Sequence, residues 1–171
     1  FEDNALEKMP AYSPTVKIAQ TIDQAMCEEV PIMTPATLLK LRANYRRILG
    51  DEPDKNIDAS DMQLTALCFK AFHSLTPYAD FGVWGPLAAR SERRLRYTNS
   101  TTDADGKTKT QEHHGPRDYE TWEECWRVYS TAMTMTNMAS PATLDKYMYA
   151  FKARAKRFPK QWHIVYRADV R

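Results

Sequence analysis

The fold of this chain is decided by residues 118–137, DYETWEECWRVYSTAMTMTN. At 100° per residue, one half of the helical wheel collects the apolar side chains Tyr119, Trp122, Cys125, Trp126, Val128, Tyr129, Ala132, Met133 and Met135. The other half collects Glu120, Glu123, Glu124, Arg127, Ser130, Thr131, Thr134 and Asn137. Because so wide an apolar arc packs against more than one neighbour, the pattern predicts a central helix, capped by Asp118.

Two further helices are expected after this one. Ser140 and Pro141 form a cap followed by a proline at the first helical position, which needs no hydrogen-bonded N–H. The narrow apolar face of that helix contains Leu144, Tyr147, Met148, Phe151, Ala155 and Phe158. Pro159 ends it, and residues 161–171 resume a helical pattern that reaches Arg171 without a stop signal. We therefore read this last helix as one that is truncated at Arg171.

Upstream, two helices have clear boundary signals. Thr34 and Pro35 predict the start of one and Gly50 its end. Ser60 with Gln63 three residues later is a capping-box pattern for the next.

The N-terminal region is less regular. Residues 14–30 have apolar side chains at helical spacing and predict a first helix, whereas residues 1–13 read as an N-terminal arm.

Two segments between the helices carry turn signals. Residues 80–86, DFGVWGP, predict an ordered turn with buried aromatic side chains. A kinase interpretation of DFG fails because no glycine-rich loop or HRD-type segment accompanies it. Residues 94–113 contain alternating side chains around an Asp103–Gly106 turn, which predicts a short β-hairpin, with a disordered loop as the alternative.

The sequence therefore predicts an all-α, single compact domain spanning residues 14–171, with five to seven helices and one small β-hairpin or ordered loop at 94–113. Its expected core consists of Leu41, Tyr45, Leu64, Leu67, Phe72, Trp84, Trp122, Trp126, Tyr129, Met133, Leu144, Tyr147 and Phe151.

With 43% hydrophobic and 27% charged residues, the chain has the composition of a folded globular protein. The three cysteines are far apart, which predicts free thiols in an intracellular, reducing compartment. No stretch is apolar for the length that a membrane span needs.

The sequence contains no recognisable catalytic or cofactor motif, so we expect no cofactor and no metal site, and we do not favour an enzyme. Cys68 and Cys125 fall on apolar helix faces, where thiols are mostly inert. His113 and His114 are adjacent, a spacing that rarely chelates one ion. Glu123 and Glu124 are read as a solvated helix face.

Clusters of Lys and Arg are the one sequence feature that suggests a binding function. Lys and Arg number 8 against 11 Asp and Glu in residues 1–75, but 16 against 11 in residues 76–171. The candidate nucleic-acid-binding residues are Arg90, Arg93, Arg94, Arg96, Lys152, Arg154, Lys156, Arg157 and Lys160. Contacts between such residues and the phosphates of a nucleic acid are favoured by the release of counterions. The alternative is a solvated basic face.

Residues 34–171 resemble a family of uncharacterised protist open reading frames often found near retroelement sequences. The shared pattern is Phe81-Gly82, Gly85-Pro86, Arg94 to Tyr97, Gly115-Pro116, Trp122, Trp126, Pro141, Leu144, Tyr147, Trp162 and Ala168-Asp169-Val170-Arg171. The resemblance implies an association with mobile elements and no particular activity.

Three function classes remain in view, of which an enzyme of unrecognised type is the least favoured. We favour a non-enzymatic protein-interaction or assembly module, such as a subunit of a large complex or a retroelement-associated structural protein that binds a protein partner or itself. The alternative is a nucleic-acid-associated module that binds the RNA or DNA backbone through its basic faces.

Overall fold

The structure is a computed structural model that describes residues 13–17, 29–72, 81–82, 84–86, 95–102 and 104–169. Within these residues lie five helices: α2 (Pro35–Leu49), α3 (Asp61–Phe72), α4 (Tyr119–Met135), α5 (Pro141–Arg157) and α6 (Trp162–Asp169). They also contain two antiparallel pairs, β1 (Ser13–Lys17) with β2 (Glu29–Ile32) and β3 (Arg96–Thr102) with β4 (Thr108–His114). The predicted mostly helical domain with a small hairpin is confirmed.

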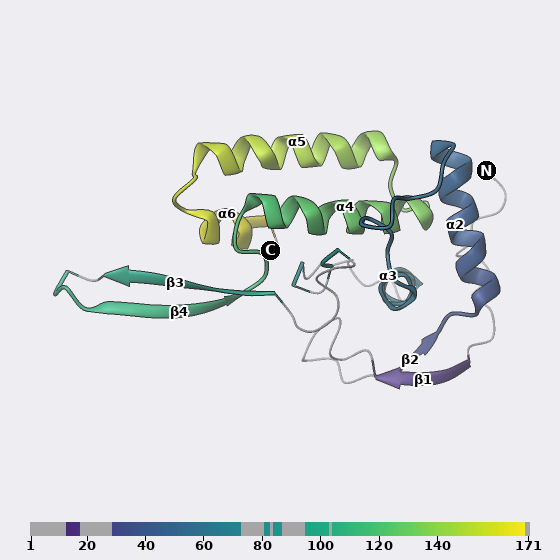
Figure 1. Cartoon of the computed structure of the whole chain (residues 1–171), viewed down its shortest axis with the longest axis horizontal. Helices are drawn as coiled ribbons and strands as arrows, with labels where there is room; N and C mark the ends of the chain where they lie inside the picture. The colour runs from purple at the N-terminus through teal and green to yellow at the C-terminus, as the bar shows by residue number, and fades with distance from the viewer. Residues whose placement is uncertain are drawn as a thin grey trace.

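Helix α4 is central, as its wide apolar arc predicts. It packs against α2, α3 and α5, and α5 runs back along it in the opposite direction (Figure 1). Its start is set by Asp118, whose Oδ1 accepts the Thr121 N–H at 2.9 Å. Thr131 and Thr134, expected on the polar half, are buried instead. The Thr134 hydroxyl compensates by donating to the Ser130 carbonyl one turn back, at 2.9 Å.

The predicted helix boundaries elsewhere are also confirmed. Thr34 caps α2 by accepting the Thr37 N–H, and Gly50 ends it in the left-handed region at φ 84°. Ser60 and Gln63 form the reciprocal capping box of α3: Ser60 N–H donates to Gln63 Oε1 at 2.9 Å, and Gln63 N–H donates to Ser60 Oγ at 3.2 Å.

Helix α5 begins as predicted, but fewer of its apolar side chains are buried than its sequence suggests. Ser140 accepts the Thr143 N–H at 3.3 Å, with Pro141 at the first helical position. Tyr147, expected in the core, is 43% exposed, and Phe158 from the same apolar face is 42% exposed. The Tyr147 ring still packs, since it stacks on Trp126 of α4 at a 4.8 Å centroid distance.

The helix predicted over residues 14–30 is wrong at both ends, at residues 14–17 and 29–30. Residues 13–17 and 29–32 form antiparallel strands, with Val16 opposite Val30 and Lys17 opposite Glu29. β-branched residues at both ends of this region favour extended backbone, and the proline in β2 is tolerated because a two-stranded sheet consists of edge strands. Of the predicted arm, residues 1–13, only Ser13 is described, as the first residue of β1; residues 1–12 and 18–28 lie outside the described residues.

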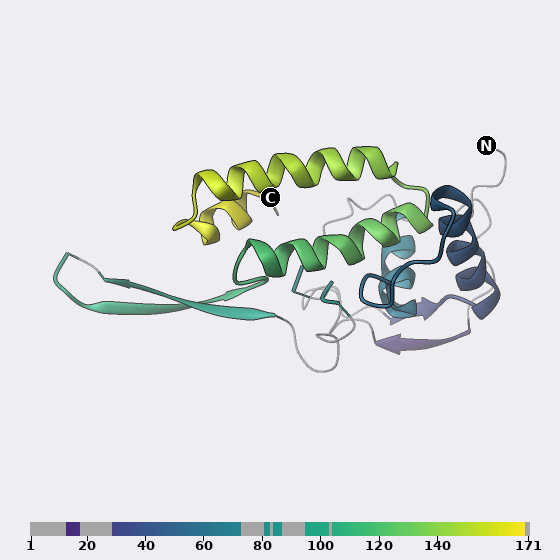
Figure 2. The same cartoon turned by 45° about the horizontal axis from the view of Figure 1, so that its top comes forward.

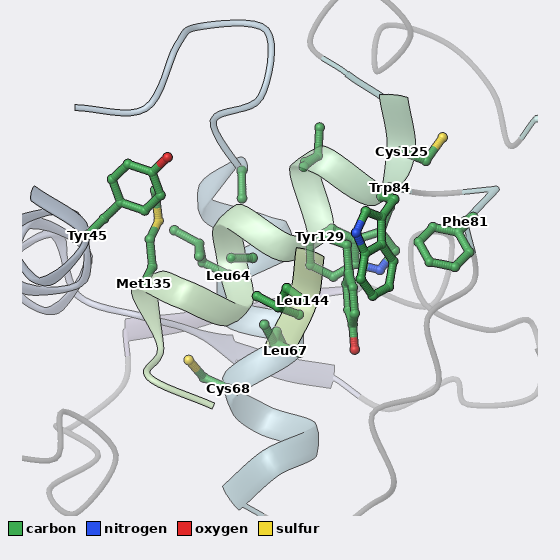
Figure 3. Close-up of a cluster of buried hydrophobic side chains, with 14 of the residues drawn as sticks. Tyr45, Leu64, Leu67, Cys68, Phe81, Trp84, Cys125, Tyr129, Met135 and Leu144 are labelled. Atoms are coloured by element: carbon green, nitrogen blue, oxygen red, sulfur yellow. The ribbon is translucent and has the colours of Figure 1, made fainter. Parts of the chain in front are cut away.

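The core is a continuous apolar cluster between α4 and its neighbours. In the close-up, side chains from α2, α3, α4 and the 81–86 turn meet around α4 (Figure 3). Phe81 and Trp84 are buried at 3% and 6% exposure, which confirms the ordered turn with buried aromatic side chains. The Phe72 side chain lies outside the described residues, and Met133 is only half-buried.

The predicted hairpin is confirmed and projects from the helical body. β3 and β4 pair in uninterrupted register from Arg96 opposite His114 to Thr102 opposite Thr108. Gly106 supplies the positive φ, 76°, that the turn requires. In both views the hairpin extends past the ends of α5 and α6 (Figures 1 and 2).

Candidate functional site

The β3–β4 hairpin is a regular element with few buried side chains. On β3, Thr98, Ser100 and Thr102 are exposed, and on β4 every residue except His113 is exposed. Residues 96–114 contain three Lys and Arg against three Asp and Glu. The hairpin is therefore a polar ribbon without net charge, unlike the phosphate-binding surface that the sequence suggested nearby.

His113 connects the hairpin to α6. Its buried ring stacks between Tyr97 of β3, at a 5.2 Å centroid distance, and His163 of α6, at 5.9 Å. Arg167 of α6 lies with Nη2 3.4 Å from His113 Nδ1. Burial, together with the charges of Arg167 and His163, lowers the pKa of His113 below its ordinary value. The neutral imidazole is thus the form that fits this contact.

The exit of the hairpin is fixed by two aromatic side chains of α6. Trp162 Nε1 donates to the Pro116 carbonyl at 2.7 Å. Gly115 adopts φ 118°, and a Cβ there would lie 2.4 Å from Cε1 of Tyr166. Any larger residue would displace the Tyr166 ring. We call Tyr97, His113, Gly115 and Pro116 the hairpin root.

Helix α6 is itself held through Asp169. Its Oδ2 accepts a hydrogen bond from Trp122 Nε1 of α4 at 3.0 Å, and its Oδ1 accepts one from the Tyr147 hydroxyl of α5. Burial raises the pKa of Asp169 despite these two donors. Burial and the neighbouring carboxylate also raise the pKa of Tyr147. Through Asp169 and the hairpin root, α6 joins the hairpin to the helical body.

The predicted basic residues do not all fall in described parts of the chain. Arg90, Arg93 and Arg94 lie outside the described residues, and Arg96 is described only in its backbone, as the first residue of β3. Arg154, Lys156, Arg157 and Lys160 are exposed at the end of α5 and after it.

The cations of α5 are spread around the helix rather than gathered on one face. Lys152 and Lys156 follow the buried Phe151 and Ala155 by one residue, whereas Arg154 precedes Ala155 and so lies on the opposite flank. Lys152 is also engaged: its Nζ is 3.9 Å from Glu123 Oε2 and 5.6 Å from the centre of the Tyr119 ring. Glu123, expected on a solvated face, is thus a partner of α5.

The described residues contain no group of three or more His, Cys, Asp or Glu side chains that could hold a metal ion. Cys68 and Cys125 are buried, and burial raises the pKa of each thiol to about 12. Both are therefore protonated, unreactive packing residues at neutral pH. None of the described helices combines the length and the apolar character that crossing a membrane requires.

Comparison with protein-family models, curated proteins and solved structures gives no match. The resemblance to protist open reading frames stays a prediction. Sequence reasoning missed the contacts of His113, Arg167 and Asp169, because each joins elements distant in the chain. The only sequence signals near them are the Gly115-Pro116 pair and the two aromatic residues Trp162 and Tyr166.

Proposed function

We propose that this chain is a non-enzymatic protein-interaction and assembly module whose contact element is the β3–β4 hairpin. The observation that supports this is a projecting ribbon whose root is held by α6 while its length is exposed. A two-stranded sheet has an open outer edge on each strand, and such edges accept strands from other chains.

The charge of the hairpin favours a protein partner over a nucleic acid. Proteins that bind phosphate backbones present an excess of Lys and Arg. Residues 96–114 have no such excess. Exposed Thr and Ser side chains along β3 favour extended backbone and leave the strand free of steric obstacles to a neighbouring strand.

Photo-crosslinking tests the proposal. A photoreactive amino acid at Ser100 in the hairpin is compared with one at Leu39, which is 66% exposed on α2. In extract of the native cells, we expect specific protein adducts from position 100 that position 39 does not give. Identical adducts from both positions, or adducts removed by nuclease, would contradict an interaction module that works through the hairpin.

A second candidate function rests on a separate observation. Residues 146–168 contain seven Lys and Arg and no Asp or Glu. Of these, Arg154, Lys156 and Arg157 lie exposed in the last turn of α5. Such a segment could bind phosphates, although cations in a last turn also stabilise the helix by interacting with its dipole.

Fluorescence anisotropy with labelled oligonucleotides at two salt concentrations decides this second candidate. Binding should weaken steeply with salt, and the double change K156E/R157E should reduce it, whereas K40E on the exposed side of α2 should not. Equal effects of both changes, or no binding at low salt, would leave the cations of α5 with a structural role.

A further inference from the structure

The hydrogen-bond pattern of the hairpin defines which backbone groups face outward. The Gly115 N–H donates to the Leu95 carbonyl at 2.8 Å, directly beyond the pair Arg96 and His114. In an antiparallel ladder, hydrogen-bonded and non-hydrogen-bonded pairs alternate. The N–H and C=O groups of Thr98, Ser100 and Thr102 on β3 therefore point away from β4. On β4, the corresponding outward residues include Thr108, Thr110 and Glu112.

The two outer edges differ in how they are protected against pairing. Natural edge strands are blunted by charged side chains, prolines or bulges. β4 carries Lys109 and Glu112, but residues 97–102 of β3, YTNSTT, contain no charge and no proline. The register of the hairpin has no bulge. Among the described residues β3 pairs with β4 alone, so the outer edge of β3 is open to another strand and lacks the charges that protect the edge of β4.

We propose that the outer edge of β3 pairs with β3 of a second copy of this chain, forming a four-stranded antiparallel sheet around a two-fold axis through Asn99. This inference rests on the proposed function and names its partner. Full overlap of the two seven-residue strands places Thr98 opposite Ser100 of the second copy, and both residues have outward backbone groups. The alternation of hydrogen bonds is therefore satisfied in this register.

Charge distribution favours a second copy over an unrelated strand. Around a two-fold axis, a charge near the middle of the strand would face the same charge in the partner, which destabilises a sheet. β3 has no such charge. In the sequence, Arg96 begins the strand and Asp103 follows it, so antiparallel pairing brings opposite charges to each end of the new ladder.

Two proline variants test the pairing with a matched control. Ser100 and Thr110 form one non-hydrogen-bonded pair, so S100P removes an outward N–H of β3 and T110P removes one of β4, and neither removes a bond within the hairpin. In sedimentation equilibrium of the purified chain we expect a monomer–dimer equilibrium. S100P should raise the dimer Kd about tenfold or more, and T110P by less than about twofold. Equal effects of both variants would overturn the proposal.

A disulfide experiment fixes the register independently of stability. The C27S change removes the one cysteine of the sequence other than the buried Cys68 and Cys125. In this background, N99C should form a cross-linked dimer on mild oxidation, because facing residues of a non-hydrogen-bonded pair have Cα atoms about 4.5 Å apart. S100C alone should not, because its copies are offset by two residues along the strands. A cross-link from S100C but not from N99C would overturn the register and the axis.

The outcomes separate this inference from the proposed function. A chain that stays monomeric and gives no N99C cross-link overturns the β3–β3 pairing. If position 100 still cross-links to a different, identified protein in cell extract, the interaction module stands and its partner is not a second copy. A monomeric chain without any protein adduct at position 100 overturns both.

Discussion

Two glycines at opposite ends of β4 show how differently the root and the tip of the hairpin are built. Gly115 and Gly106 both have positive φ, 118° and 76°. A Cβ on Gly115 would lie 2.4 Å from the Tyr166 ring, whereas at Gly106 no heavy atom of the described chain lies within 4 Å. The root is part of the packed body, and the tip is shaped only by its own turn. The hairpin is thus held firmly at its root while most of its described side chains stay exposed.

The largest effect on stability is expected at Trp122, which lies in the core of the helical body and bonds to α6 behind the hairpin root. Trp122 is fully buried, stacks on Phe151 at a 4.0 Å centroid distance and donates to Asp169. W122A should lower the free energy of unfolding by about 3–5 kcal/mol, because it leaves a cavity and an unpaired carboxylate oxygen. Urea unfolding followed by circular dichroism measures this loss. A loss below about 1 kcal/mol would mean that α4 is not the centre of the core.

The glycine pair gives the next largest effect and the sharpest comparison. G115A should destabilise the chain by about 2–4 kcal/mol through backbone strain and displacement of Tyr166. G106A meets only the backbone cost, about 1 kcal/mol. Thermal or urea unfolding of both variants measures the difference. Equal losses would show that the root is no more constrained than the tip.

Loss of a single donor to Asp169 should have a smaller effect. Y147F removes the hydroxyl that donates to Oδ1, while the ring keeps its stacking on Trp126 at a 4.8 Å centroid distance. We expect a loss of about 1 kcal/mol, since Tyr147 is half-exposed and water replaces part of the bond. Y149F, at a 65% exposed position on the same helix, is the control and should be neutral. Urea titration of the two variants side by side checks this.

The smallest effect is a pH dependence at the root. The folded state lowers the pKa of His113 below the value of about 6.5 that it has when unfolded. As the pH falls from 7.5 through 6.5, the unfolded chain takes up a proton that the folded chain excludes, so stability decreases on acidification. Unfolding midpoints measured from pH 7.5 to 5.5 should fall, and H113Q should flatten that slope. An unchanged slope in H113Q would assign the titration to another group.

The sequence was sufficient to predict features that depend on contacts between residues close together in the chain. Caps at Thr34, Ser60, Asp118 and Ser140 set helix starts by hydrogen bonds within one turn, and all four were predicted. The hairpin was also predicted, because its turn and its strand residues are adjacent in the chain. The helix expected over residues 14–30 was wrong at its ends, where residues 14–17 and 29–30 pair as strands, because pairing between segments distant in the chain is not visible in local spacing.

The candidate site was less predictable, because its residues act through long-range contacts. The basic clusters stand out in the sequence, but nothing in their spacing says that Lys152 pairs with Glu123. Nor does it say that the hairpin beside the arginine cluster projects from the helical body.

By itself, the sequence determined the helical class, the boundaries of most helices, the central position of α4 and the existence of the hairpin. These follow from side-chain periodicity and from bonds made within a few residues. Only the tertiary structure decided that α6 lies against the hairpin root, with Tyr166 over Gly115 and Asp169 between Trp122 and Tyr147. It also decided that the hairpin projects with β3 at an open edge. The physical reason is that such contacts depend on how faces of distant elements pack, and each face has several partners that its pattern alone would accept.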